Sequence, residues 1–178
     1  MRKLHKISCF VLKRKTLLEK DAFVSLYSLE QGKIVAMVKG VRKFTSKRAA
    51  HIQTGNLIKA EISETKSGNY LQGSYLVSGF MKLRSSEFIG HIYLILAVID
   101  GLMPEGVSEP VVFYSIKRFF AKLGLDLDPD DALRVSLQEI IDTLGYTDKK
   151  HNLSELIEIA ENNMEKKLPR NVIMSFYG

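Results

Sequence analysis

The sequence has a single cysteine, Cys9, among its 178 residues. No intrachain disulfide can form, and a zinc site built from several cysteines is excluded. The four histidines are scattered, without the pair four residues apart that is typical of metal ligands on one helix. We therefore expect no metal site and no cofactor, and the low cysteine content suits a reducing cytoplasm.

Motifs for enzymatic chemistry are also missing. The sequence has no Gly-x-x-x-x-Gly-Lys-Ser/Thr phosphate loop, no Gly-x-Ser-x-Gly nucleophile elbow and no His-Glu-x-x-His zinc helix. The acidic stretch from Asp126 to Asp131 lacks the glycine and the later glutamate of a calcium-binding loop, so its aspartates are better explained as helix caps. We predict a protein that is not an enzyme and takes no small-molecule substrate.

Long apolar segments are absent as well. The longest, Phe88 to Ile99, has about twelve residues and is interrupted by a glycine and a histidine, whereas a membrane helix needs about 20. The apolar run Ile7 to Leu12 is followed by three basic residues in place of a cleavage site. We expect neither an export signal nor a membrane partner.

What the sequence does have is a very uneven distribution of charge. Residues 1–84 contain 17 Lys and Arg against 5 Asp and Glu, a net charge of +12, whereas residues 85–178 contain 9 against 15, a net charge of −6. A basic excess of this size favours binding to a polyanion, because neutralised phosphates release condensed counterions. We predict two domains, residues 1–84 and residues 85–178, with nucleic acid as the main partner.

The first domain has the pattern of five short strands. The segments are rich in β-branched and aromatic residues and are separated by glycine or charged turns; they span residues 7–13, 22–29, 33–39, 56–65 and 70–80. Gly32 can adopt the positive φ that the hairpin between the second and third strands needs. This pattern favours a closed antiparallel barrel of the OB type, with an SH3-like barrel as the alternative.

The second domain has a helical pattern, which makes the fold class α+β. Helix starts are predicted at Ser85-Ser86-Glu87, Ser108-Glu109-Pro110, Asp128-Pro129 and Asn152-Leu153-Ser154-Glu155. Gly101, Gly124 and Gly145 follow the expected ends of the first three helices.

Two basic clusters are the candidate nucleic-acid site. The first is a loop after the third strand, in which cations surround one aromatic residue: Lys39, Arg42, Lys43, Phe44, Lys47 and Arg48. Such a loop can follow a phosphate backbone while Phe44 stacks on a base; the alternatives are a solvated loop and an aromatic anchor onto the barrel. The second cluster, Lys13, Arg14 and Lys15, ends the first strand, where it either joins this surface or blunts a sheet edge.

The N-terminal half resembles the bacterial RecO family of recombination mediators. The matching residues are Glu19-Lys20-Asp21, the run from Leu26 to Ile34, the run from Val38 to Lys43, Ser46, and the run from Leu57 to Ile62. The Gly-Lys turn followed by a Lys-Gly-x-Arg loop is fairly specific in combination. Many relatives carry a four-cysteine zinc module that has no counterpart in this sequence, so the resemblance is to a short form without zinc.

The resemblance implies an OB-fold domain followed by a helical domain and a role in DNA repair without catalysis. It implies binding to single- and double-stranded DNA, strand annealing and recombinase loading, with RecR and the single-stranded DNA-binding protein as possible partners, in the cytoplasm at the nucleoid. The DNA-binding role then falls on Arg14, Lys39, Arg42, Lys43, Lys47 and Arg48. A protein-docking adaptor and an RNA-binding barrel are the alternatives left open by charge alone.

Overall fold

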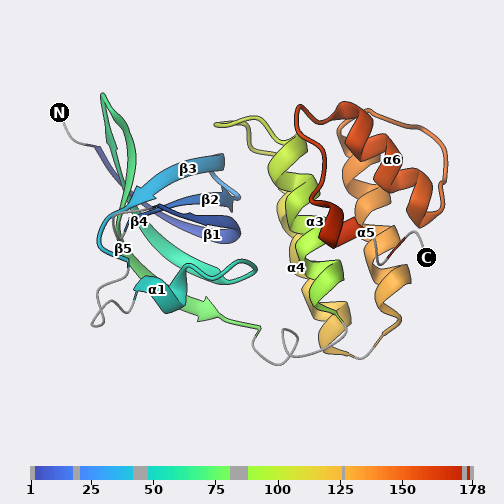
Figure 1. Ribbon diagram of the computed structural model, residues 1–178, viewed down its shortest axis with the longest axis horizontal. Helices are drawn as coiled ribbons and strands as arrows, with labels where there is room; N and C mark the ends of the chain where they lie inside the picture. The colour runs from blue at the N-terminus through green and yellow to red at the C-terminus, as the bar shows by residue number, and fades with distance from the viewer. Residues whose placement is uncertain are drawn as a thin grey trace. The chain divides into compact units, whose positions relative to one another are not determined.

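The computed structural model describes residues 3–17, 21–41, 48–80, 88–125, 127–173 and 176. The chain divides into two compact units, Met1–Gly79 with Met103–Ser108, and Phe80–Leu102 with Glu109–Gly178. The first contains a β-barrel with one short helix, and the second is helical (Figure 1). The predicted α+β class is therefore confirmed.

Five strands form the barrel, and they close into a ring in the order β1-β2-β3-β5-β4. Their bounds are β1 Lys3–Thr16, β2 Ala22–Ser28, β3 Gly32–Val38, β4 Leu57–Thr65 and β5 Gly68–Ser78. All neighbours are antiparallel except β3 and β5, which are parallel. One parallel pair is unavoidable, because strand directions cannot alternate all the way round a ring of five. This order fits the predicted OB-type barrel.

Strand β1 is longer than the predicted residues 7–13. Its first half pairs with β4 and its second half with β2, so one curved strand belongs to both sides of the barrel. The register with β2 shifts between Val11 and Lys13, which identifies a β-bulge at Leu12. The extra residue changes which side chains after the bulge point into the barrel.

Alternating side chains of all five strands fill the barrel. The core includes Val24 and Leu26 of β2 and Ile58 and Ile62 of β4, each at most 2% exposed. Cys9 is fully buried in the same core, and burial, with a smaller contribution from Glu30, strongly raises the pKa of its thiol. The lone cysteine is therefore a protonated core residue at neutral pH.

The segment Met103–Ser108 follows a helix in sequence yet belongs to the barrel unit. The Gly106 N–H donates to the carbonyl oxygen of Lys33 at 2.9 Å, and the hydroxyl of Ser108 donates to the carbonyl oxygen of Leu29. The segment therefore binds along the connection between β2 and β3. The domain boundary predicted between residues 84 and 85 lies among residues 81–87, outside the described part of the chain, and it stays a prediction.

The second unit contains helices α3 Ile89–Leu102, α4 Pro110–Gly124, α5 Pro129–Thr143, α6 Leu153–Asn163 and α7 Arg170–Ile173. Helix α3 is apolar on nearly all sides and packs against the other four. Two predicted helix starts are confirmed. Asp128, the predicted cap, accepts from the N–H of Asp130 at 3.0 Å, and at the other start Glu109 accepts from the N–H of Val111 at 3.4 Å. The predicted start of the first helix lies outside the described residues. No helix in the described ranges is long and apolar enough to cross a bilayer.

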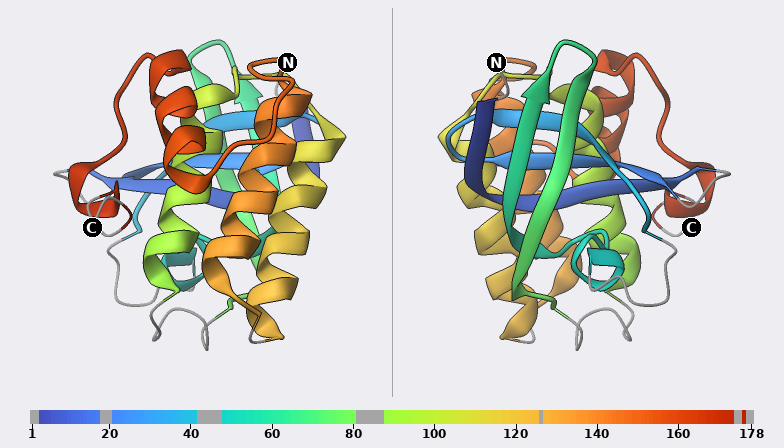
Figure 2. Two further views of the ribbon diagram at one scale, coloured as in Figure 1. Left: turned by 90° about the vertical axis from the view of Figure 1, so that its right-hand side faces the viewer. Right: turned by 90° about the vertical axis from the view of Figure 1, so that its left-hand side faces the viewer.

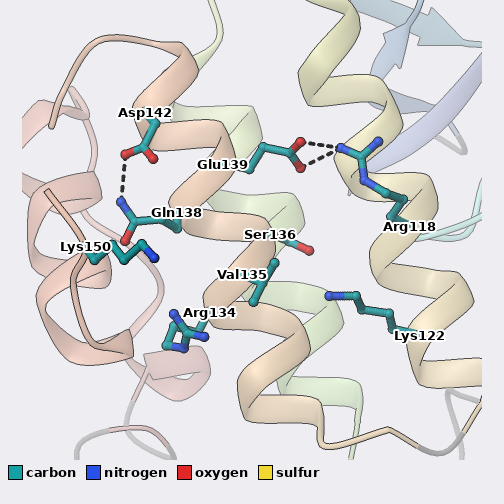
Figure 3. Close-up of a pocket in the computed structure, with 9 residues that line it drawn as sticks. All are labelled: Arg118, Lys122, Arg134, Val135, Ser136, Gln138, Glu139, Asp142 and Lys150. Atoms are coloured by element: carbon teal, nitrogen blue, oxygen red, sulfur yellow. Dashed lines mark hydrogen bonds and ion pairs between the residues drawn. The ribbon is translucent and has the colours of Figure 1, made fainter. Parts of the chain in front are cut away.

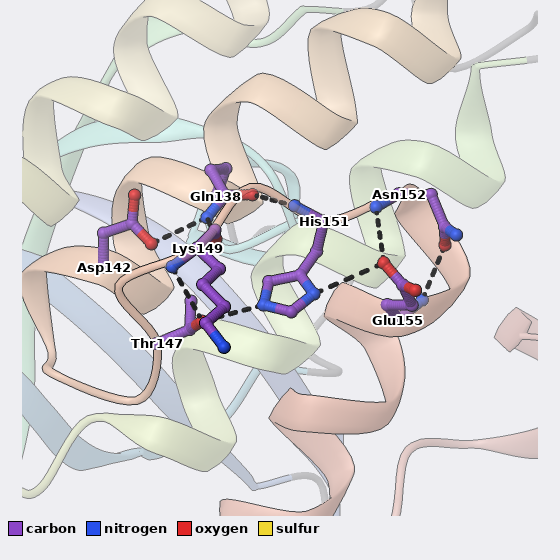
Figure 4. Close-up of polar contacts among 7 residues, drawn as sticks. All are labelled: Gln138, Asp142, Thr147, Lys149, His151, Asn152 and Glu155. Carbon is purple, nitrogen blue, oxygen red and sulfur yellow. Dashed lines mark hydrogen bonds and ion pairs between the residues drawn. The ribbon is translucent and has the colours of Figure 1, made fainter.

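The connection between α5 and α6 is held by His151 (Figure 4). Its ring nitrogens lie 2.7 Å from the hydroxyl of Thr147 and 3.3 Å from a carboxylate oxygen of Glu155, and its backbone N–H donates to Gln138. Asn152 and Glu155 exchange hydrogen bonds of 2.9 Å as a capping box, at the predicted helix start. This histidine therefore has a structural role.

Gly32 provides a test of how the barrel unit is packed. Its φ is +64°, as its sequence position predicts, and a Cβ placed on it would lie only 1.8 Å from the carbonyl oxygen of Val107. Gly106 has a similar φ of +76° but open space where a Cβ would lie. We expect Gly32→Ala to lower the free energy of unfolding by about 3 kcal/mol and Gly106→Ala by about 1 kcal/mol, measured by urea denaturation. Equal losses would show that only backbone strain matters at Gly32.

Candidate nucleic-acid interface

The described part of the chain contains only some of the predicted basic residues. Lys13, Arg14 and Lys15 lie at the end of β1, and Lys39 directly follows β3. Arg48 is the first residue of the short helix α1, Arg48–His51, but its side chain is not described. Arg42, Lys43, Phe44 and Lys47 lie in residues 42–47, outside the described residues. On the two sides of that segment the structure describes Gly40 and Ala49.

Arg14 joins the end of β1 to the far end of the basic segment. After the bulge it pairs with Val24, whose side chain is in the barrel core, so Arg14 points toward the barrel interior at its mouth. There one guanidinium nitrogen donates to the carbonyl oxygen of Ala49 in α1 at 3.2 Å. Lys13 and Lys15 point the other way and are exposed. Because of the bulge, Arg14 has a structural contact, whereas Lys13 and Lys15 lie at the surface.

Asp21 holds the near end of the same segment. Its carboxylate accepts a hydrogen bond from the backbone N–H of Gly40 at 2.8 Å, and its own carbonyl oxygen accepts from the N–H of Leu17 at 2.9 Å. Gly40 has a φ of +67°, a conformation that suits glycine. The connection between β1 and β2 is thus bonded to the chain immediately before residues 41–48.

These two contacts place Gly40 and Ala49 at the same end of the barrel. Gly40 is bonded to Asp21 and Ala49 is bonded to Arg14, and both Asp21 and Arg14 lie next to the β1–β2 connection. Lys13 and Lys15 belong to the same end of β1. Within the described residues, neither Lys15 nor Lys39 forms an ion pair, whereas Lys6, further back on β1, is paired with Glu61 at 3.2 Å. Lys15 and Lys39 at this end can therefore contact an anionic partner.

Lys39 extends this end toward β5. Its ammonium nitrogen lies 5.4 Å from the ring centroid of Tyr70, a cation–π contact. The hydroxyl of Tyr70 is in turn 3.3 Å from that of Ser67 in the turn between β4 and β5. We refer to Lys13, Lys15 and Lys39 together as the basic end. Sequence reasoning missed Asp21 and Ala49 as its anchors, because a bond to a backbone group leaves no residue pattern.

A second polar surface lies within the helical unit, along α4 and α5 (Figure 3). It is a groove of about 560 Å³ whose lining includes four cations and two carboxylates. Arg118 donates to both oxygens of Glu139 at 2.6 Å, and Ser115 also donates to Glu139. Because carboxylates are interspersed with its cations, this groove is a weaker candidate for a polyanion than the basic end.

Comparison with known proteins agrees with the geometry of the barrel unit. The family model described as "Recombination protein O N terminal" matches residues 1–80. Proteins called "DNA repair protein RecO" are 26% identical over 130 residues in Syntrophobacter fumaroxidans, 24% over 161 in Pseudoalteromonas atlantica and 30% over 113 in Pelotomaculum thermopropionicum. The matches cover 72%, 90% and 63% of this chain, and 52%, 67% and 44% of the respective relatives. The chain thus spans between 44% and 67% of the length of these relatives.

The anchor at Asp21 can be tested with two substitutions. Asp21→Ala removes the acceptor and leaves the Gly40 N–H without its partner, so we expect the free energy of unfolding to fall by about 1 kcal/mol. Asp21→Asn keeps an amide oxygen at the same position, so its free energy of unfolding should fall clearly less than that of Asp21→Ala. Urea denaturation of both variants measures the difference, and an equal loss would show that the charge of Asp21, not its hydrogen bond, stabilises the fold.

The Arg118–Glu139 pair predicts a pH effect on the helical unit. Burial alone would raise the pKa of Glu139, but hydrogen bonds from Ser115 and Arg118, together with the charges of Arg118 and Lys122, outweigh it and bring the pKa below the ordinary value of 4.5. A carboxylate with a lowered pKa stabilises the fold when the pH is above the pKa that this group has in the unfolded chain. The stabilisation is lost as the pH falls through the pKa of the folded state.

We therefore expect Glu139→Gln to lower the melting temperature at about pH 7. The difference between the melting temperatures at pH 7 and at about pH 4 should be smaller in this variant than in the natural protein. The matched control is Glu158→Gln on α6, at an exposed carboxylate with no ion pair among the described residues. Thermal unfolding followed by circular dichroism measures both. If the melting temperature of Glu139→Gln depends on pH as much as that of the natural protein, ionised Glu139 does not stabilise the helical unit.

Proposed function

Because the chain belongs to the RecO family, we propose that it is a non-enzymatic DNA-binding protein of recombinational DNA repair. It binds single- and double-stranded DNA, promotes the annealing of complementary strands and assists recombinase loading. The observation that supports this most directly is the pair of hydrogen bonds Asp21–Gly40 and Arg14–Ala49, which place the residues on both sides of the segment 41–48 at the end of the barrel that carries Lys15 and Lys39. Contacts with RecR and the single-stranded DNA-binding protein, and action at the nucleoid in the cytoplasm, follow from the same family membership.

The proposed mechanism is electrostatic. Two DNA strands repel each other through their phosphates, and a cationic surface that holds both lowers the cost of bringing them together. Lys15 at the end of β1 and Lys39 after β3 offer exposed ammonium groups, which contact the phosphate backbone and not the base edges. Binding should therefore be salt-sensitive, with little preference for sequence.

We expect the double variant Lys15→Glu with Lys39→Glu to weaken binding to single-stranded DNA at least about tenfold at low salt. Loss of two phosphate contacts should reduce the slope of log K against log salt by about 1.4, because each contact contributes about 0.7. The unfolding temperature should change little, since both lysines are exposed. The measurement is fluorescence anisotropy with a labelled oligonucleotide at several salt concentrations.

The matched control is Lys166→Glu with Lys167→Glu, which changes the net charge equally at exposed positions between α6 and α7. If both double variants lose the same affinity, net charge alone governs binding and the basic end is not the site. Strand pairing that is no faster with protein than without would contradict the annealing role. Tighter binding to RNA than to DNA would favour an RNA-binding barrel instead.

A further inference from the structure

The outward face of β5 carries an exposed aromatic residue that the basic end does not include. Tyr75 is 67% exposed, and Leu76 and Val77 after it are 45% and 51% exposed. Strand β5 lies beside β4, and the right-hand view of Figure 2 shows the two strands running together. An aromatic side chain that is left in water on a regular strand has contact area available for a flat, apolar partner.

Tyr75 lies opposite a lysine in the register of the sheet. It pairs with Lys59 of β4, and Lys59 pairs with Ser8 of β1, so these three residues form one outward row across three strands. Lys59 is exposed, and within the described residues it forms no ion pair. The row therefore combines an aromatic ring with a neighbouring ammonium group.

The adjacent row leaves the ring of Tyr75 uncovered. It consists of Lys6, Glu61 and Gly73, one on each of the same strands. Gly73 has no side chain, and a Cβ placed there would lie 2.8 Å from a carboxylate oxygen of Glu61. The charge of Glu61 is compensated by Lys6 at 3.2 Å, so it does not repel an anion approaching Lys59.

Hydrogen bonds connect this row with the basic end. Ser74, directly before Tyr75, lies with its carbonyl oxygen 2.9 Å and its hydroxyl 3.1 Å from Nδ1 of His51. His51 is the last residue of α1, the helix whose residue Ala49 accepts from Arg14. One short helix thus bonds to β1 on the side of the basic clusters and to β5 beside Tyr75.

We propose that Tyr75 is a stacking platform for an unpaired nucleobase, with Lys59 contacting the adjacent phosphate. The inference rests on the proposed DNA binding and deepens it, because it assigns the strand preference. Cations of the basic end hold the backbone of either DNA form, whereas the ring of Tyr75 can meet the face of a base only where that base is not stacked inside a duplex. The protein should therefore bind single strands more tightly than duplex of the same length.

The test compares Tyr75→Ala and Tyr75→Phe on single-stranded and blunt duplex DNA. Tyr75→Ala should weaken binding to the single strand about tenfold, as expected for one lost base–aromatic stack, and change duplex binding less than about twofold. Tyr75→Phe keeps the aromatic face and should bind nearly as the natural protein does. Lys59→Ala should reduce the salt slope on single strands by about 0.7. The control is Tyr146→Ala in the helical unit, where the side chain is 38% exposed.

Tyrosine fluorescence gives a second readout, because the chain contains no tryptophan. Addition of oligothymidine should quench part of the emission of the natural protein, and that part should be missing in Tyr75→Phe. Circular dichroism and thermal unfolding verify that each variant folds.

The inference fails if Tyr75→Ala weakens single strand and duplex equally, or if it weakens neither. Unchanged DNA binding would show that the exposed side chains of β5 do not contact DNA. These outcomes are separate from failure of the proposed function: if the double variant at Lys15 and Lys39 loses affinity and Tyr75→Ala does not, only the stacking role is wrong.

Discussion

Repulsion between clustered cations is the constraint that the barrel unit must overcome. Like charges held together destabilise the compact state, so the chain on either side of the basic segment has to be fixed by other contacts. Here the fixing contacts are hydrogen bonds to backbone groups, from Gly40 to Asp21 and from Arg14 to Ala49. They are formed by one acid and one cation at the β1–β2 connection, and neither of them uses Lys15 or Lys39.

The geometry of the barrel explains why these contacts are possible. The bulge at Leu12 turns Arg14 toward the interior, where it reaches α1, and leaves Lys13 and Lys15 on the outer face. Closing five strands into a ring places β5 beside β3, which brings Tyr70 within reach of Lys39. The basic end therefore depends on strand register, which sets the direction of Lys13 and Lys15, and on ring closure, which places Lys39 beside Tyr70.

Local signals in the sequence predict most of the elements. Alternation and turn residues identify the five strands, and the caps at Asp128 and Asn152 mark two helix starts, because each of these signals acts over a few residues. Three features have no such signal. The bulge in β1, the short helix α1 and the attachment of Met103–Ser108 to the β2–β3 turn all depend on contacts between distant residues. The basic residues can be found from the sequence, but the hydrogen bonds Asp21–Gly40 and Arg14–Ala49 cannot.

An annealing protein has to hold strands firmly without hiding the edges through which bases pair. Cationic contacts alone satisfy this requirement, since they bind phosphates and leave bases free, but they cannot distinguish a single strand from the duplex that annealing produces. A base stacked on its face keeps its hydrogen-bonding edge accessible, and it must leave the platform when it joins a duplex. A surface with many lysines and few aromatic rings thus binds the unpaired substrate more tightly than the product, which favours release of the product. In the proposed annealing role, the lysines of the basic end hold phosphates, and the row of Tyr75 and Lys59 supplies the preference for unpaired bases.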